Sequence, residues 1–165
     1  MKILLKNATL LHEKSPFHNQ IKDVLIDDGI LTQIEDQIDI KSDQVVNLKD
    51  LHLSSGWFDP NVSFGEPGFE ERETLENGLL TAAKSGFTHI VLNPDTEPVI
   101  NTHADVSHLV QTTAHQTTKL HISTVLSDAG EGKQMASLYD LQNAGAVAFG
   151  DFKKAYSNPN LLRIA

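Results

Sequence analysis

The first part of the chain carries short apolar runs separated by polar turns, a pattern typical of β-strands. Residues 3–11 predict one strand, and residues 24–26 predict another that stops at Asp27, Asp28 and Gly29. An Asp-Gly pair between two such runs is a hairpin signal, so residues 22–35 are expected to pair as a hairpin. With a further strand at residues 45–48, this region predicts a small antiparallel sheet.

The pattern changes after residue 54, where strand-like and helix-like segments alternate. Strands are expected at 57–59 (buried), 87–92, 120–126 and 146–149, and helices at 73–85, 102–117 and 135–143. Alternation of this kind predicts a parallel sheet with crossover helices. A doubly wound sheet and half of a (β/α)₈ barrel both satisfy it. No Gly-x-Gly-x-x-Gly motif follows the first of these strands, which disfavours a dinucleotide-binding sheet.

The end of the chain carries the start of another helix. Asn158 and Pro159 are suited to an N-cap and a first helical position, and Leu161, Leu162 and Ile164 begin an apolar face. A helix this short contributes little by itself. We therefore expect a truncated chain with two parts, residues 1–54 and residues 55–165, the second holding about half of a barrel.

Charge and composition exclude several classes of function. The chain has 13 Lys and Arg against 22 Asp and Glu, a net charge of −9, which disfavours binding to a nucleic-acid backbone. The absence of cysteine excludes disulfides, thiolate zinc sites and cysteine nucleophiles. No apolar run approaches the roughly 18 residues of a spanning helix, so we expect no membrane role and a cytoplasmic protein.

Four stretches carry a family resemblance. Residues 56–78 read GWFDPNVSFGEPGFEERETLENG, which resembles the dihydroorotase signature G-[LF]-I-D-x-H-x-H-x-R-E-P-G. Residues 24–34 (VLIDDGILTQI), 86–100 (GFTHIVLNPDTEPVI) and 145–151 (GAVAFGD) are similar to the N-terminal hairpin, the M-P-N-T segment and the fourth barrel strand of that family. The resemblance implies an α/β fold: a TIM-type (β/α)₈ barrel of the amidohydrolase family, of which about the first half is present, plus the N-terminal part of a small β-sandwich.

The same resemblance implies a zinc-dependent ring closure and opening between carbamoyl-aspartate and dihydroorotate in pyrimidine biosynthesis. Two histidines of the H-x-H motif are metal ligands in the family, because alternate strand residues point to one side. In this chain those positions are Asn61 and Ser63, and neither side chain suits zinc.

The substrate-binding positions also depart from the family. The arginine that forms a planar fork with the substrate carboxylate is replaced by Gly65. The asparagine of the M-P-N-T segment is replaced by Asp95, and a carboxylate there would repel an anionic substrate. Asp59 and Asp151 are retained as weak candidate metal ligands. We expect zinc to be absent or weakly bound and the active site to be degenerate.

Two hypotheses follow. The first is a non-catalytic dihydroorotase homologue that forms a homo-oligomer and serves as a structural partner of aspartate transcarbamoylase. The second is an active cyclic amidohydrolase, acting as a dihydroorotase, hydantoinase or allantoinase through a rebuilt site and a metal-bound hydroxide. The eight histidines form no motif typical of a metal site, and His89 and His121, within predicted strands, are expected to be scaffold residues.

Overall fold

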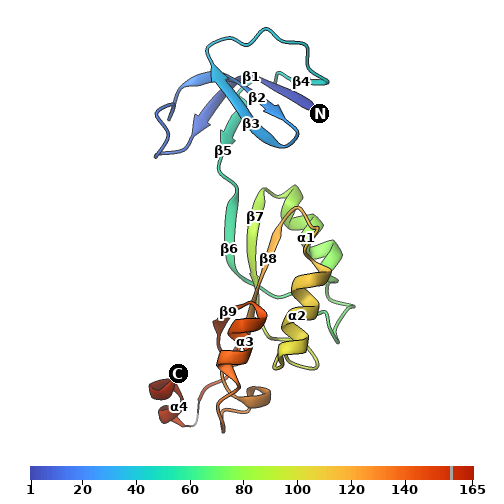
Figure 1. Cartoon of the computed structure of the whole chain (residues 1–165), viewed down its shortest axis with the longest axis vertical. Coiled ribbons are helices and arrows are strands. Elements are labelled where there is room, and N and C mark those ends of the chain that lie inside the picture. Colours follow the sequence, from blue (N-terminus) through green and yellow to red (C-terminus); the bar gives the residue numbers. More distant parts are fainter. Residues whose placement is uncertain (157) are drawn as a thin grey trace. The chain divides into compact units, whose positions relative to one another are not determined.

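The computed structural model describes residues 1–156 and 158–165 and divides the chain into two compact units, Met1–Ser55 and Gly56–Ala165 (Figure 1). The first unit holds the strands β1 (Lys2–Leu11), β2 (Ile21–Asp27), β3 (Ile30–Glu35), β4 (Gln44–Val46) and β5 (His52–Ser54). The second holds β6 (Trp57–Val62), α1 (Leu75–Lys84), β7 (Phe87–Leu92), α2 (His103–Thr112), β8 (Lys119–Thr124), the short 3₁₀ helix η1 (Asp128–Gly130), α3 (Leu138–Ala144), β9 (Ala146–Phe149) and α4 (Pro159–Ile164).

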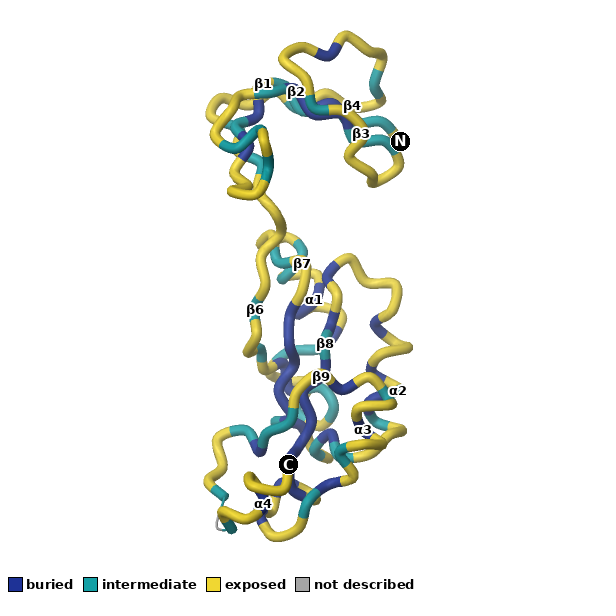
Figure 2. Tube along the Cα trace, turned by 60° about the vertical axis from the view of Figure 1, so that its left-hand side comes forward, coloured by how far each residue is buried: buried dark blue, intermediate teal, exposed yellow. Residues whose placement is uncertain are grey.

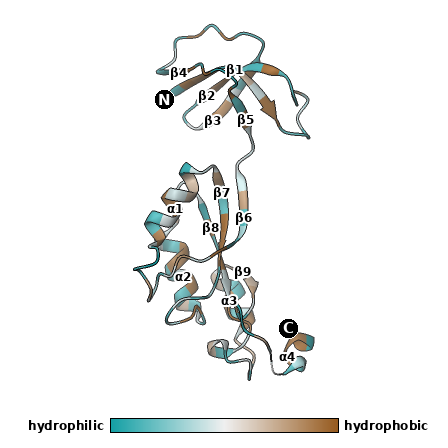
Figure 3. Cartoon of the chain, turned by 180° about the vertical axis from the view of Figure 1, so that it is seen from behind, coloured by the Kyte–Doolittle hydropathy of each residue, from teal (hydrophilic) through white to brown (hydrophobic). Residues whose placement is uncertain are grey.

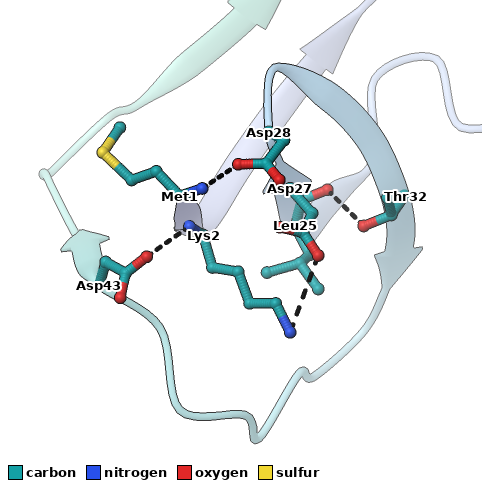
Figure 4. Close-up of polar contacts among 7 residues, drawn as sticks. All are labelled: Met1, Lys2, Leu25, Asp27, Asp28, Thr32 and Asp43. Atoms are coloured by element: carbon teal, nitrogen blue, oxygen red, sulfur yellow. Dashed lines mark hydrogen bonds and ion pairs between the residues drawn. The ribbon is translucent and has the colours of Figure 1, made fainter.

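The first unit is built around the predicted hairpin, which is confirmed. β2 and β3 pair antiparallel, and Asp28 and Gly29 turn the chain with φ values of 47° and 80°. Positive φ at both turn positions matches the twist of the flanking strands and favours Gly at the second. Figure 4 shows the polar contacts at this end of the sheet: the terminal ammonium of Met1 contacts the Asp28 carboxylate of the turn, and the Lys2 amide donates to Asp43, just before β4, at 2.7 Å.

The prediction of a wholly antiparallel sheet in this unit is wrong. The strand order is β3-β2-β1-β4, and β4 and β5 both pair with β1 in parallel. Residues 36–43 carry the chain from β3 past β2 to the far side of β1, so β4 enters in the same direction as β1. A long connection of this kind leaves no turn signal from which the direction could be read.

The second unit confirms the predicted alternation. Its four strands form a parallel sheet in the order β6-β7-β8-β9. α1 packs on β7, α2 on β8 and α3 on β9. The strands turn apolar residues toward these helices, and the tube in Figure 2 is dark blue in the later parts of β7 and β8. The buried core on this side includes Leu79, Ile90, Leu92, Val106, Leu109, Leu120, Ile122 and Leu141.

Two predicted helices differ from the observed ones at their ends. α2 begins with a capping box, in which Thr102 and Asp105 satisfy each other's backbone amides, but it ends at Thr112 instead of residue 117 and leaves Ala114 exposed. α3 begins at Leu138 instead of residue 135, because Met135 pairs with Ser127 in an isolated antiparallel bridge. The apolar spacing that predicted these helices contains no information about the bridge between Ser127 and Met135.

The strand predicted at residues 57–59 is present, but the prediction that it is buried is wrong. Trp57 and Phe58 are both more than half exposed. β6 lies at the edge of the sheet, where a strand has a neighbour on one side only.

In the part of the chain that the structure describes, no helix combines the length and the apolar character that a membrane span needs.

Candidate functional site

The carboxyl ends of parallel strands are where barrel-type folds place their chemistry, since the loops that follow the strands meet there. In this unit the loops after β6, β7 and β9 carry every position at which the sequence predicted a ligand or substrate contact, apart from Asp59 and Asn61, which lie within β6. These positions fall into four separate surroundings.

The two positions expected to have lost metal-binding histidines are joined by a hydrogen-bonded amide. The side-chain Nδ2 of Asn93, directly after β7, donates to Asn61 Oδ1 at 2.6 Å and to Ser63 Oγ at 3.2 Å. The Asn93 backbone amide donates to Val62 O at 2.9 Å, which holds the two strand ends together. A donor group therefore lies between the two side chains, where a metal ion would need lone pairs.

Asp59 lies apart from this cluster. Its register partner is Ile90, a core residue, and a bulge between Asp59 and Val62 breaks the simple alternation along β6. One carboxylate oxygen accepts from the Asn61 amide at 2.9 Å, and the side chain lines a cavity of about 190 Å³ between β6 and α1. The bulge explains why Asp59 and Asn61, two residues apart, serve different sides of the strand.

Gly65 is buried in the loop after β6 with a φ of 120°. A Cβ atom at this position would lie 2.5 Å from Phe69 O, closer than any side chain tolerates. The loop is closed by the Phe69 amide, which donates to Gly65 O at 3.0 Å. The position that resembles the family's substrate arginine therefore has a backbone that only glycine adopts comfortably.

The Glu-Pro-Gly part of the motif is structural in this chain. Glu66 accepts a hydrogen bond from the Leu75 amide at 2.6 Å, at the first turn of α1. Gly68, with a φ of 98°, lies so close to the loop after β7 that a Cβ would come within 2.0 Å of Glu97 O. Glu97 in turn donates its amide to Pro67 O at 2.9 Å. These contacts join the loops after β6 and β7.

Asp95 and Asp151 are brought together at a second place. Both line a cavity of about 200 Å³, together with Lys154, whose Nζ donates to Gly130 O at 3.1 Å. Asp95 Oδ1 is buried and, within the described residues, accepts no hydrogen bond. With the carboxylates of Asp95, Asp151 and Glu97 against the single ammonium of Lys154, the lining carries more negative than positive charge, which disfavours a ligand that is itself an anion.

Asp151 is committed to the backbone around it. The residue is 6% exposed, and its Oδ1 accepts from the amides of Leu126 and Ser127 at 2.9 and 3.0 Å. Its Oδ2 accepts from the Ser127 hydroxyl, which itself accepts from the Gly132 amide at 2.7 Å. The carboxylate thus ties the end of β9 to the loop after β8.

The residues present do not fit a catalytic zinc. Zinc prefers imidazole, thiolate and carboxylate ligands in sets of three or four. Among residues 1–156 and 158–165, no group of three or more His, Asp or Glu side chains is placed to hold a metal ion. The predicted candidates Asp59 and Asp151 line different cavities and already accept hydrogen bonds from backbone amides.

One side-chain pair was missed by the sequence reasoning. His89 on β7 and His121 on β8 stack at a ring-centroid distance of 5.3 Å, with His89 Nδ1 3.0 Å from His121 Nε2. Burial lowers the pKa of His121, and the neighbouring His89 and Lys119 add to the effect. The parallel pairing of β7 and β8 was predicted, but the register that brings His121 beside His89 was not, so their spacing of 32 residues gave no signal.

Comparison with known proteins gives consistent results. No family model matches the chain. It is 30% identical over 167 residues to a protein named dihydroorotase from Ruminiclostridium cellulolyticum, and 31% identical over 165 residues to one from Acetivibrio thermocellus. The alignments cover 100% and 99% of this chain but 39% and 38% of those proteins, so the chain spans about two fifths of their length.

Solved structures show the same fold. An L-hydantoinase from Arthrobacter aurescens matches with a TM-score of 0.71 at 18% identity, over 89% of this chain and 32% of that one. A dihydroorotase crystal structure matches with a TM-score of 0.61 at 13% identity, over 90% of this chain and 41% of that one. The parallel sheet described above is thus part of an amidohydrolase-type TIM barrel.

Proposed function

This chain is a homologue of the dihydroorotases, and from that premise we propose that it is a non-catalytic member of their pyrimidine-biosynthesis family, with a structural role in place of ring hydrolysis. The observation that carries the proposal is the Asn93 amide, which donates to both Asn61 and Ser63. An amide N–H presents hydrogen where a metal site needs lone pairs.

The substrate side of the site supports the same conclusion. The position of the expected arginine is Gly65, where even a Cβ atom would lie 2.5 Å from a backbone oxygen. The position of the expected asparagine is Asp95, which shares a small cavity with Asp151. An anionic substrate such as dihydroorotate would therefore meet carboxylates without the cationic fork that should hold it.

The retained motif supports a structural role. Glu66 binds the first turn of α1, and Gly68 packs against the backbone of Glu97. These residues hold the shape of the strand-end loops without contributing chemistry. Loops of fixed shape can be recognised by a partner protein. The family resemblance suggests aspartate transcarbamoylase as the first partner to test.

The proposal is tested with the full chain, assayed for dihydroorotate hydrolysis and for the reverse reaction, with added zinc and with a chelator. An active dihydroorotase serves as the positive control. We expect no turnover above background and no stoichiometric zinc after dialysis. Chelator-sensitive turnover would show instead that the chain is an active cyclic amidohydrolase and that Asn61 and Ser63 are tolerated.

A matched variant makes the test specific to the metal positions. Asn61→His combined with Ser63→His restores two imidazoles at the strand end, and the Asn93 amide then loses both acceptors. We expect this double variant to take up more zinc than the native chain, as measured by metal analysis. The partnership is tested by sedimenting the native chain with aspartate transcarbamoylase. Co-sedimentation supports a structural role, and independent sedimentation contradicts this partner.

A further inference from the structure

Two imidazoles on neighbouring strands of the second unit meet through their nitrogen atoms. His89 on β7 presents its Nδ1 to His121 Nε2 on β8 at 3.0 Å, and the two ring planes are inclined by only 16°. At this distance one of the facing nitrogens carries a hydrogen and the other offers a lone pair. One proton therefore lies between the rings.

The strand register brings the two rings together. β7 and β8 pair in parallel, with His89 beside Lys119 and His121 beside Val91. Alternate residues of a strand point to opposite faces, and the residues that flank the two histidines belong to the core under the helices: Ile90, Leu120 and Ile122. Both imidazoles therefore lie on the other face of the sheet. Figure 3 shows the ribbon of β7 turning from teal to brown toward its carboxyl end, where the buried half of the strand begins.

The hydrogen bond between the rings involves β7 and β8 alone. His89 is exposed and His121 is half-buried. Any segment or ligand that covers this face of the sheet buries the rings further, and burial disfavours a charged imidazole. Covering this face therefore strengthens the preference of the pair for its neutral form.

The pair accepts one additional proton readily and a second one with difficulty. When one ring is charged, the imidazolium donates to the neutral ring, and such a charge-assisted hydrogen bond is stronger than a neutral one. When both rings are charged, each facing nitrogen carries a hydrogen, so the hydrogen bond is lost and two like charges lie side by side. The two rings thus titrate as a coupled pair.

The groups around the pair also oppose the second charge. Burial lowers the pKa of His121, and His89 and the ammonium of Lys119 lower it further. On β6 the one titratable residue, Asp59, lines the cavity beside α1 instead, and β9 contains no titratable residue. The described strands β6 to β9 therefore place no carboxylate against the pair that would offset a second charge.

We propose that His89 and His121 form a pH-sensitive switch that joins β7 to β8 through a shared proton and loosens this strand pair when both rings become charged. β7 leads directly to Asn93, whose side-chain amide joins Asn61 and Ser63. The charge of the imidazole pair is thus linked to the contacts at the strand ends.

Nitrogen NMR of the native chain tests the shared proton directly. The chain is labelled with ¹⁵N-histidine and titrated from about pH 8 to about pH 5 with a chelator present, so that no metal ion takes the place of the proton. We expect a coupling between His89 Nδ1 and His121 Nε2, and two separate titration steps, the later one below the ordinary imidazole pKa near 6.5. The coupling should disappear with the second step. Rings that titrate independently, or no coupling at any pH, would overturn the proposal.

Unfolding measurements test the effect on the fold. Because the pKa of His121 is lower in the folded chain than in the unfolded chain, the unfolded chain takes up more protons in acid. The stability that the neutral ring contributes is complete above the ordinary pKa near 6.5 and is lost as the pH falls through the lower, folded-state value. We expect the melting temperature of the second unit, followed by Trp57 fluorescence, to fall by roughly 2–4 °C, as for the loss of one hydrogen bond.

His121→Gln is the informative variant, because the amide of glutamine can take the place of Nε2 in the hydrogen bond without titrating. It should flatten the loss of stability in acid. His89→Asn makes the equivalent change at Nδ1 and is used if His121→Gln does not fold. His115→Gln is the matched control, since His115 is an exposed histidine of the same unit outside the pair, and it should keep the native profile. A native chain that loses no stability in this interval, or a His121→Gln chain that loses as much as the native one, would contradict the switch.

Discussion

Replacing Asp151 is the substitution whose consequence the structure specifies most fully. Its carboxylate is 6% exposed, and its Oδ1 accepts from the amides of Leu126 and Ser127. Asp151→Ala would remove the acceptor that the two amides share and leave two buried N–H groups unpaired. The resemblance makes this residue a candidate metal ligand, whereas the contacts make it a clamp between the end of β9 and the loop after β8.

The expected cost follows from those contacts. A buried donor left without its partner costs about 1–3 kcal/mol, so the two amides together cost about 2–6 kcal/mol of unfolding free energy. In a chain of this size the melting temperature falls by roughly 2–4 °C per kcal/mol, which places the loss at about 4–24 °C. Asp151→Asn keeps one carbonyl oxygen for the two amides and should cost only about 1 kcal/mol.

The assay is urea and thermal unfolding followed by Trp57 fluorescence, which reports on the second unit alone because the chain has a single tryptophan. A chelator should leave the native melting temperature unchanged, since the clamp needs no metal. Equal stability of the native chain and Asp151→Ala would refute the clamp. If a chelator destabilised the native chain as much as Asp151→Ala does, Asp151 would be a metal ligand instead.

Other substitutions test the remaining parts of the account. Gly65→Ala should destabilise the second unit by about 1–3 kcal/mol, because the position combines positive φ with a backbone oxygen 2.5 Å from the new Cβ. Gly86→Ala, with positive φ but nothing within 4 Å, should cost less in the same urea titration, and the reverse order would contradict the steric argument. In the first unit, burial of Asp23 opposes its ionisation, but hydrogen bonds from Lys6 and from two backbone amides outweigh this and lower its pKa. The stability that ionised Asp23 contributes is therefore present above the ordinary carboxyl pKa near 4 and is lost as the pH falls through the lower, folded-state value. Asp23→Asn should flatten this acid limb of the stability profile, and an unchanged limb would assign it to another group.

Much of the fold could be predicted because local signals and tertiary structure agree. The Asp28-Gly29 turn, the strand at Phe87–Leu92 and the Asn158 N-cap each depend on residues close together in the chain. The parallel pairing of β4 with β1 depends on a long connection without turn chemistry. The exposure of Trp57 depends on which strand lies at the edge, and apolar patterning does not contain that information.

The candidate site was predictable as a set of positions but not as an arrangement. The sequence shows that Asn61 and Ser63 are poor zinc ligands, but the side chain that joins them, Asn93, comes from another strand. The role of Asp151 as a backbone acceptor, and the close approach of Phe69 O to Gly65, likewise depend on loop conformation. A family motif identifies which residue stands at each position, and only the packing shows what it does there.

The most direct test of the central claim is to measure zinc content and dihydroorotate turnover on one preparation of the native, folded chain. The account predicts substoichiometric zinc and no turnover in either direction, with or without added metal. One zinc or more per chain together with chelator-sensitive turnover would contradict it, because the Asn93 amide would then have to give way to a working metal site.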